Sequence, residues 1–205
     1  MANTTFTGPV RSINGYEQIS KNATSGKITV ISGNKMATEA LGSAGIEGTA
    51  ETYLTQVERF KSDTDTNVNI VKTTLMIDLT GLASSAAGDI IGKSGTGVAY
   101  IGRVTTEDTG TVFGVNIECF ETPAGGDPDI DLYSATEATG VEDTAITALT
   151  ETLIINSGDL TAGSRVAGGT IVADQYLYLV AGSATNADYT AGRIVITIHG
   201  YDVAS

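Results

Sequence analysis

Apolar and polar residues alternate with a period of two along most of this chain, which is the pattern of half-buried β-strands. The clearest run spans residues 111–121. Its predicted core face carries Phe113, Val115, Ile117 and Cys119. The positions between them, Gly114, Asn116 and Glu118, are small or polar. This run therefore predicts a strand with one face in the core and the other toward solvent.

Similar runs recur at short intervals, separated by turn formers such as Ser-Gly-Asn at 32–34 and Pro-Ala-Gly-Gly at 123–126. They cover residues 27–32, 52–61, 69–79, 97–104, 145–156, 170–181 and 193–203. No stretch sustains the i, i+3, i+4, i+7 spacing of a helix over three turns. Residues 83–92 would add at most one helical turn or a short strand. The pattern predicts an all-β protein, an antiparallel β-sandwich whose strand order is a jelly roll or another Greek key.

The 205 residues suffice for one substantial domain, and no repeat or proline-rich linker divides them. Residues 1–25 are polar and interrupted by Gly8-Pro9 and Asn14-Gly15, so they predict an extended N-terminal arm. Residues 26–205 are expected to form a single sandwich domain. The first residues also lack the apolar stretch of a secretory signal.

Charge is distributed unevenly along the chain. The formal net charge is −13. Residues 1–103 carry nine basic and nine acidic groups, whereas residues 104–205 carry two basic groups against fifteen carboxylates. Such a balance argues against nucleic-acid binding, which needs Lys and Arg to neutralise phosphates. The acidic half is expected to form a solvated face. No apolar run is long enough for a membrane helix, so no membrane partner is expected.

Candidate catalytic chemistry is sparse. The chain has one cysteine, Cys119, and one histidine, His199. Cys119 falls on the apolar face of its run and is expected to be a buried hydrophobic residue. His199 alternates away from the isoleucines at 194, 196 and 198, which predicts a surface or interface position. We expect no catalytic residue, no cofactor and no enzymatic activity.

The acidic segment Asp127-Pro-Asp-Ile-Asp131 places three carboxylates at alternate positions. An EF-hand calcium loop needs Gly at its sixth position and Glu at its twelfth, but Leu132 and Ala138 stand there. We therefore predict no metal and a polar surface loop with Ile130 and Leu132 pointing inward. A calcium site of another geometry is the alternative.

The opening Ala2-Asn-Thr-Thr-Phe-Thr-Gly-Pro-Val-Arg-Ser-Ile-Asn-Gly-Tyr16 follows the form T-F-x-G-P-V-R-S-x-N-G-[FY]. In this segment and in two others, the chain resembles small structural proteins of tailed bacteriophages, especially phages of marine bacteria. The other two segments are 121–134, ETPAGGDPDIDLYS, and 192–201, GRIVITIHGY. They touch both ends and the middle of the chain, and none of them carries chemistry.

The resemblance implies a virion component, in particular a capsid decoration (cement) protein. It would bind the outer surface of the major capsid protein shell after assembly in the host bacterial cytoplasm. Decoration proteins of this group often lie on threefold axes, so a homotrimer is expected. The alternative is a tail-fibre or spike module that binds a receptor. An enzyme on a jelly roll and an unrelated β-sandwich adhesin or lectin are further alternatives.

The arm and one strand supply the candidate contact residues. The arm could add a strand to an exposed sheet edge of the shell protein, since main-chain hydrogen bonds would supply affinity. Its capsid-contact candidates are Phe6, Val10, Arg11, Ile13 and Tyr16. In the run 174–180, Tyr176 and Tyr178 share one face and the leucines share the other. Because exposed aromatic residues are favoured at interfaces, these two tyrosines are the candidates for contact between copies.

Overall fold

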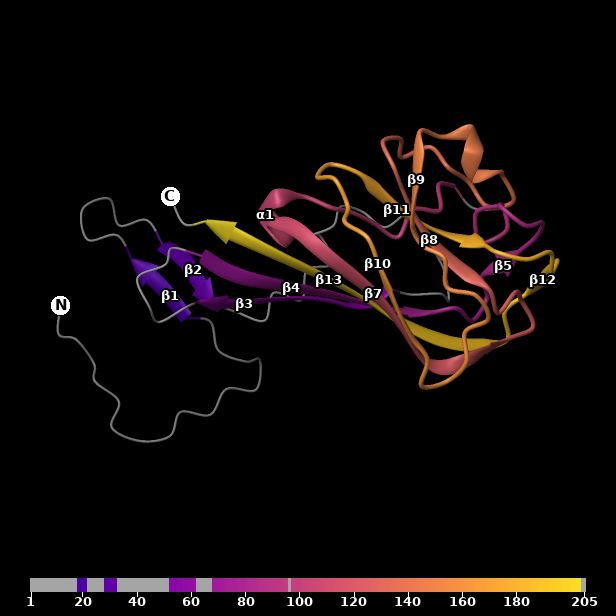
Figure 1. The fold of residues 1–205 in the computed structure, drawn as a ribbon, viewed down its shortest axis with the longest axis horizontal. Coiled ribbons are helices and arrows are strands. Elements are labelled where there is room, and N and C mark those ends of the chain that lie inside the picture. Colours follow the sequence, from indigo (N-terminus) through magenta and orange to yellow (C-terminus); the bar gives the residue numbers. More distant parts are fainter. Residues whose placement is uncertain (1–17, 22–27, 33–51, 62–67, 96, 204–205) are drawn as a thin grey trace. The chain divides into compact units, whose positions relative to one another are not determined.

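A computed structural model describes residues 18–21, 28–32, 52–61, 68–95 and 97–203, with side chains from residue 68 onward. The chain divides into two compact units, residues 1–35 and 36–205. In the described part of the first unit, β1 (Gln18–Lys21) pairs antiparallel with β2 (Ile28–Ser32) (Figure 1). Residues 18–21 fall within the predicted arm, and the remainder of that arm lies outside the described residues. The division into an arm and a single sandwich domain stays a prediction.

The larger unit is built on a five-stranded antiparallel sheet of order β10-β7-β13-β4-β3 (Figure 1). Its strands are β3 (Thr52–Lys61), β4 (Val68–Asp78), β7 (Thr111–Ala124), β10 (Arg165–Gly168) and β13 (Ala191–Val203). β13 is the central strand, because its register runs along the whole of β4 and along most of β7. The C-terminal run therefore holds the sheet together.

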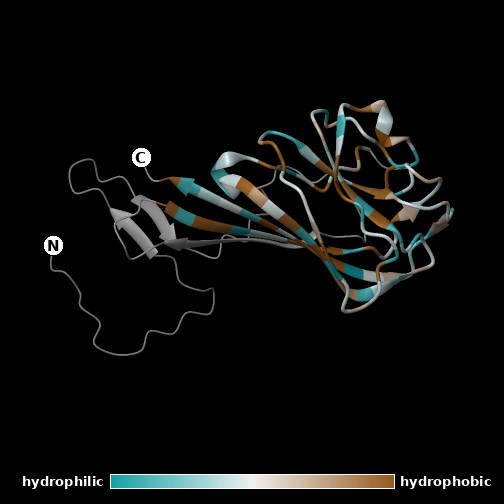
Figure 2. Ribbon diagram, viewed as in Figure 1, coloured by the Kyte–Doolittle hydropathy of each residue, from teal (hydrophilic) through white to brown (hydrophobic). Residues whose placement is uncertain are grey.

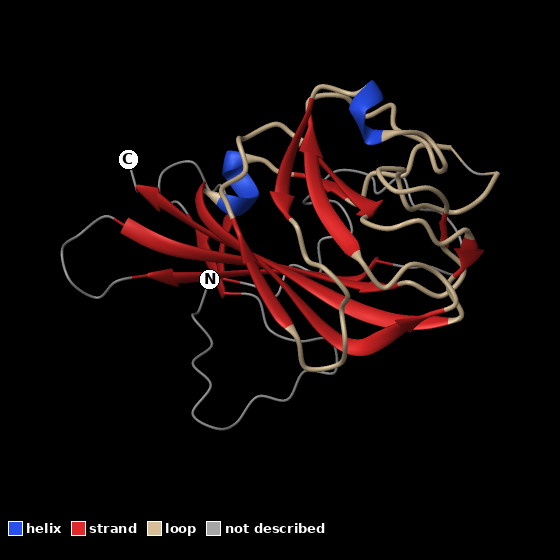
Figure 3. Cartoon of the chain, turned by 45° about the vertical axis from the view of Figure 1, so that its right-hand side comes forward, coloured by secondary structure: helices blue, strands red, loops and turns tan. Residues whose placement is uncertain are grey.

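A second antiparallel sheet has the order β6-β11-β8-β9. Its strands are β6 (Gly102–Arg103), β8 (Ile130–Ala135), β9 (Glu151–Ile155) and β11 (Tyr176–Ala181). A separate two-stranded pair joins β5 (Ala83–Ser84) to β12 (Ala187–Asp188). The described helices are single turns, α1 (Thr106–Thr109) and the 3₁₀ turn η1 (Ile146–Ala148) (Figure 3).

The main core lies between the two larger sheets. β4, β7 and β13 contribute one wall, including Leu75, Ile117 and Ile196, and β8 and β11 contribute the other with Leu132 and Leu179. All five side chains are completely or almost completely buried. Apolar residues alternate with polar ones along the long strands, as Figure 2 shows. Burial of one face per strand is thus what the period-two pattern specifies.

A smaller core covers the other face of the four-stranded sheet. Tyr178 and Val180 of β11 pack there against Ile90, Ala99 and Ile146, which come from segments outside the strands. The four-stranded sheet is therefore buried on both faces at β11. This explains why that strand is apolar at nearly every position instead of alternating.

These observations confirm the predicted all-β antiparallel sandwich, and the jelly-roll connectivity stays a prediction. Details of several runs differ. β8 begins at Ile130, inside the segment 127–131 that was predicted as a loop. Residues 145–156 begin with the turn η1 before β9. Within 97–104 only β6 is a strand. β10 has only four residues, which is too short a run for its alternation to be detected from the sequence.

Phe113 is a correction to the predicted core face of β7. Its side chain is 53% exposed, whereas Val115, Ile117 and Cys119 are buried. The register with β13 shifts between His199 and Gly200, so one extra residue of β7 is inserted there. This β-bulge turns Phe113 out of the core, and a strict period of two cannot anticipate it.

Candidate functional site

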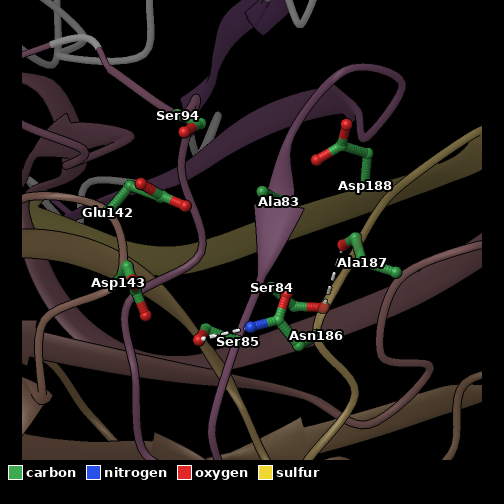
Figure 4. Close-up of a pocket in the computed structure, with 9 residues that line it drawn as sticks. All are labelled: Ala83, Ser84, Ser85, Ser94, Glu142, Asp143, Asn186, Ala187 and Asp188. Carbon is green, nitrogen blue, oxygen red and sulfur yellow. Dashed lines mark hydrogen bonds between the residues drawn. The ribbon is translucent and has the colours of Figure 1, made fainter.

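A polar depression of about 190 Å³ lies beside the β5–β12 pair (Figure 4). Glu142 and Asp143 form one wall, and Ala187 and Asp188 of β12 lie opposite (Figure 4). Ser84 and Ser85 lie between them, and the remaining lining comes from Ala83, Ser94 and Asn186. The depression thus brings together three carboxylates and three hydroxyl groups from segments that are distant in the sequence.

Hydrogen bonds hold this depression in shape. The Ser84 hydroxyl donates to the Thr185 carbonyl at 2.7 Å, and the Asn186 amide donates to the Ser85 hydroxyl at 3.4 Å. Asp143 adopts a φ of 61°, a left-handed backbone conformation that few residues other than glycine accept. The carboxylate wall is therefore fixed by a turn and not only by packing.

Burial and like charges determine the electrostatics of the depression. Desolvation raises the pKa of Glu142, and the neighbouring Asp143 and Asp188 raise it further. Among the described residues, no group of three His, Cys, Asp or Glu side chains is arranged to hold a metal ion. The depression accordingly offers oxygen acceptors and negative charge to a polar or cationic group.

The acidic segment 127–131 is more deeply buried than the sequence predicts. Asp127 is fully buried, and Asp131 is 6% exposed. Asp127 accepts hydrogen bonds from the Ser183 hydroxyl at 2.6 Å, from the Ser183 N–H at 2.8 Å and from the Asp129 N–H at 3.0 Å. Ile130 is buried as expected. The prediction of a polar surface loop is thus corrected, because Asp127 ties this turn to the segment after β11.

The other two carboxylates of this turn, Asp129 and Asp131, lie in surroundings that disfavour their charged forms. Desolvation raises the pKa of Asp129, as do the charges of Asp131, Asp127 and Asp159. Its Oδ1 atom is buried without a hydrogen-bond partner. Desolvation also raises the pKa of Asp131, although its Oδ1 accepts from the Ser157 N–H at 2.9 Å. Both side chains would carry their charge at a cost in stability.

Cys119 and His199 lie on opposite faces of the five-stranded sheet. Cys119 is 1% exposed, and burial raises the pKa of its thiol. His199 is half-buried on the outer face, where its Nε2 lies 3.1 Å from the side-chain amide of Asn116. Cys119 pairs in register with Ile194, five positions from His199 along β13. The sheet thus separates the thiol from the imidazole.

The two candidate interface tyrosines differ in exposure. Tyr178 is fully buried, and its hydroxyl donates to the Glu137 carbonyl at 2.8 Å. Burial raises its pKa to about 12. It is therefore inaccessible to a second copy in this fold. Tyr176 is half-buried beneath the Arg103 guanidinium, 5.6 Å from its ring centroid. The sequence predicted that the rings of Tyr176 and Tyr178 lie on an exposed face of the strand. That face is covered by the smaller core, which the sequence did not predict.

The capsid-contact candidates Phe6, Val10, Arg11, Ile13 and Tyr16 all lie outside the described residues. Sequence reasoning also missed the polar depression and the contact between Asp127 and Ser183. Neither has a local signal, because each joins segments more than 40 residues apart that meet only in the fold.

Fold and site together define an antiparallel β-sandwich protein with a second small core and an acidic surface depression. No helix among the described residues has the length and apolarity needed to cross a membrane. Comparisons with protein families, curated proteins and solved structures find no match.

Proposed function

We propose that this chain is a bacteriophage virion structural protein, a decoration protein that binds the outer surface of the major capsid protein shell. In this role it stabilises the head by bridging neighbouring shell subunits. It acts as a homotrimer through binding alone, without a cofactor or a chemical step.

The observation that carries this proposal is where the phage-like segments lie in the fold. Segment 192–201 occupies most of β13, the central strand of the five-stranded sheet. Segment 121–134 runs from the end of β7 through the buried Asp127 turn into β8. Both segments contribute to the framework of the sandwich, so the proposal is based on residues of the structural core and not on a surface loop.

The distribution of charge supports the same role. The described carboxylates far outnumber the described cations, and a negative surface keeps a protein soluble and repels DNA. A head protein exposed to the medium benefits from both properties. The predominantly β fold also provides a rigid body of modest size, which a stabilising clamp on a shell requires.

Immunogold electron microscopy of virions tests the proposal. Antibodies against the chain are expected to label the whole head surface of the phage that encodes it. Quantitative mass spectrometry of the same virions should find a copy number comparable to that of the shell protein. Labelling restricted to the tail tip would instead support a receptor-binding fibre or spike. Absence of the chain from purified virions would refute a structural role.

A further inference from the structure

Exposed apolar side chains concentrate on the outer face of the five-stranded sheet. Nine large hydrophobic side chains are exposed in the described part of the chain, and six of them belong to β4, β7 and β13. These six are Val68, Ile70, Phe113, Phe120, Tyr201 and Val203. Tyr201 pairs in register with Ile70, and Val203 pairs with Val68, so four of them form two cross-strand pairs. We call this set of six the outer apolar set.

Both exposed phenylalanines occur where β7 has a β-bulge. The register with β13 shifts once between Arg193 and Ile194, where Phe120 is the extra residue, and again between His199 and Gly200, where Phe113 is the extra residue. Phe120 is 61% exposed and Phe113 is 53% exposed. Bulges re-aim side chains, and here both present a large aromatic ring to solvent instead of to the core.

The outer face is close to neutral, whereas the rest of the described surface is acidic. Arg165 pairs with Glu118 at 3.0 Å, and Arg193 lies 3.4 Å from Asp78 and 3.7 Å from Glu121. With Lys72, opposite His199 in the register, the outer face of β4, β7, β10 and β13 carries three cations and three carboxylates. Elsewhere between residues 68 and 203 there are fourteen carboxylates and two cations.

We infer that the outer face of the five-stranded sheet, centred on Phe113 and Phe120, is the surface by which a second copy of this chain binds. Two molecules of net charge −13 repel each other wherever their acidic surfaces meet. On the outer face the charges are paired within each copy, so the faces of neighbouring copies can pack together around the axis of the proposed homotrimer without net repulsion and bury their aromatic rings. Closed symmetry is the usual outcome of such self-association.

The experiment measures the oligomeric state of the full chain by sedimentation equilibrium and native mass spectrometry. The wild type is expected to associate at micromolar concentration. The double variant Phe113→Thr and Phe120→Thr retains residues suited to strands and should raise the dissociation constant at least about tenfold, as removal of aromatic anchors does. Val172→Thr is the matched control, because Val172 is 68% exposed but lies outside the sheet. Its dissociation constant should equal that of the wild type.

Thermal melts accompany these measurements, and all variants should unfold close to the wild-type temperature because the substituted side chains are exposed. Raising the salt concentration should maintain or strengthen association, since it screens the repulsion between acidic surfaces. A monomeric wild type, or a double variant as tightly associated as the wild type, would overturn the inference. If the double variant associated as tightly as the wild type but no longer bound capsids, the outer face would be the binding surface for the shell protein instead.

Discussion

Asp129 shows how the fold places a charge at a cost. Its pKa is raised, so the folded state binds a proton more readily than the unfolded chain, and stability falls as pH rises through the folded pKa. We expect Asp129→Asn to stabilise the protein at pH 7 by about 1 kcal/mol, the scale of one unfavourable charge contact. That corresponds to roughly 2–4 °C in melting temperature for a chain of this size. Below the ordinary range for Asp, the gain should disappear, because the carboxyl is then protonated in both states.

Asp174→Asn is the control for this measurement. Asp174 forms an exposed ion pair with Arg103 at 2.8 Å, with 71% of its side chain accessible, and Asn tolerates its φ of 67°. The melting temperature of this variant should change little at any pH. A chelator should leave the wild-type melt unchanged, and a large decrease would reveal a bound metal. If Asp129→Asn destabilised the protein at pH 7, this would contradict the inference that the charge of Asp129 destabilises the folded state.

Asp127 is the opposite case, a buried carboxylate whose hydrogen bonds are satisfied. Replacing it with Ala would leave two N–H groups and one hydroxyl without their acceptor. We expect a loss of about 3 kcal/mol in the free energy of unfolding, measured by urea denaturation. Asp127→Asn keeps one acceptor oxygen and should lose less. An Ala variant as stable as the wild type would show that the turn is not held by this side chain.

At the scale of elements, the β1–β2 hairpin belongs to a compact unit of its own, residues 1–35. Deleting only residues 1–25 would remove β1 and leave β2 without its described partner. Deleting residues 1–35 removes the whole unit, so we expect residues 36–205 to remain folded with a melting temperature close to that of the full chain. If the arm binds the shell, cosedimentation with undecorated capsids should be lost.

The two readouts of this deletion are independent. Normal capsid binding by the truncated chain would exclude the arm as the attachment segment, whereas loss of folding would show that it belongs to the sandwich. The alternative is that the arm packs on its own body or on a neighbouring copy. In that case the truncation should alter the oligomeric state measured by sedimentation.

For the molecule as a whole, the net charge of −13 should make stability depend on ionic strength. Like charges repel in the compact state, and salt screens them over about 10 Å at 0.1 M. We therefore expect the melting temperature to rise by a few degrees from low to moderate sodium chloride, measured by differential scanning calorimetry. A decrease would mean that ion pairs such as Arg165–Glu118 outweigh the general repulsion.

The sequence by itself determined the all-β class, because the period-two alternation of β4, β7 and β13 is a local pattern of the chain. It also determined that Cys119 and Ile130 are buried. These properties depend only on which side chains avoid water and on how side chains alternate along a strand.

Only the tertiary structure decided that Phe113 is exposed and that Tyr178 and Asp127 are buried. Phe113 is turned outward by a bulge that exists only in the register of β7 against β13. Tyr178 is covered by segments around Ile90 and Ile146, and Asp127 by a contact with Ser183, which is 56 positions away. Each outcome depends on a partner distant in the sequence, so local alternation could not specify it. The polar depression beside β5 and β12 has the same origin, because its carboxylates and hydroxyl groups meet only after the chain has folded.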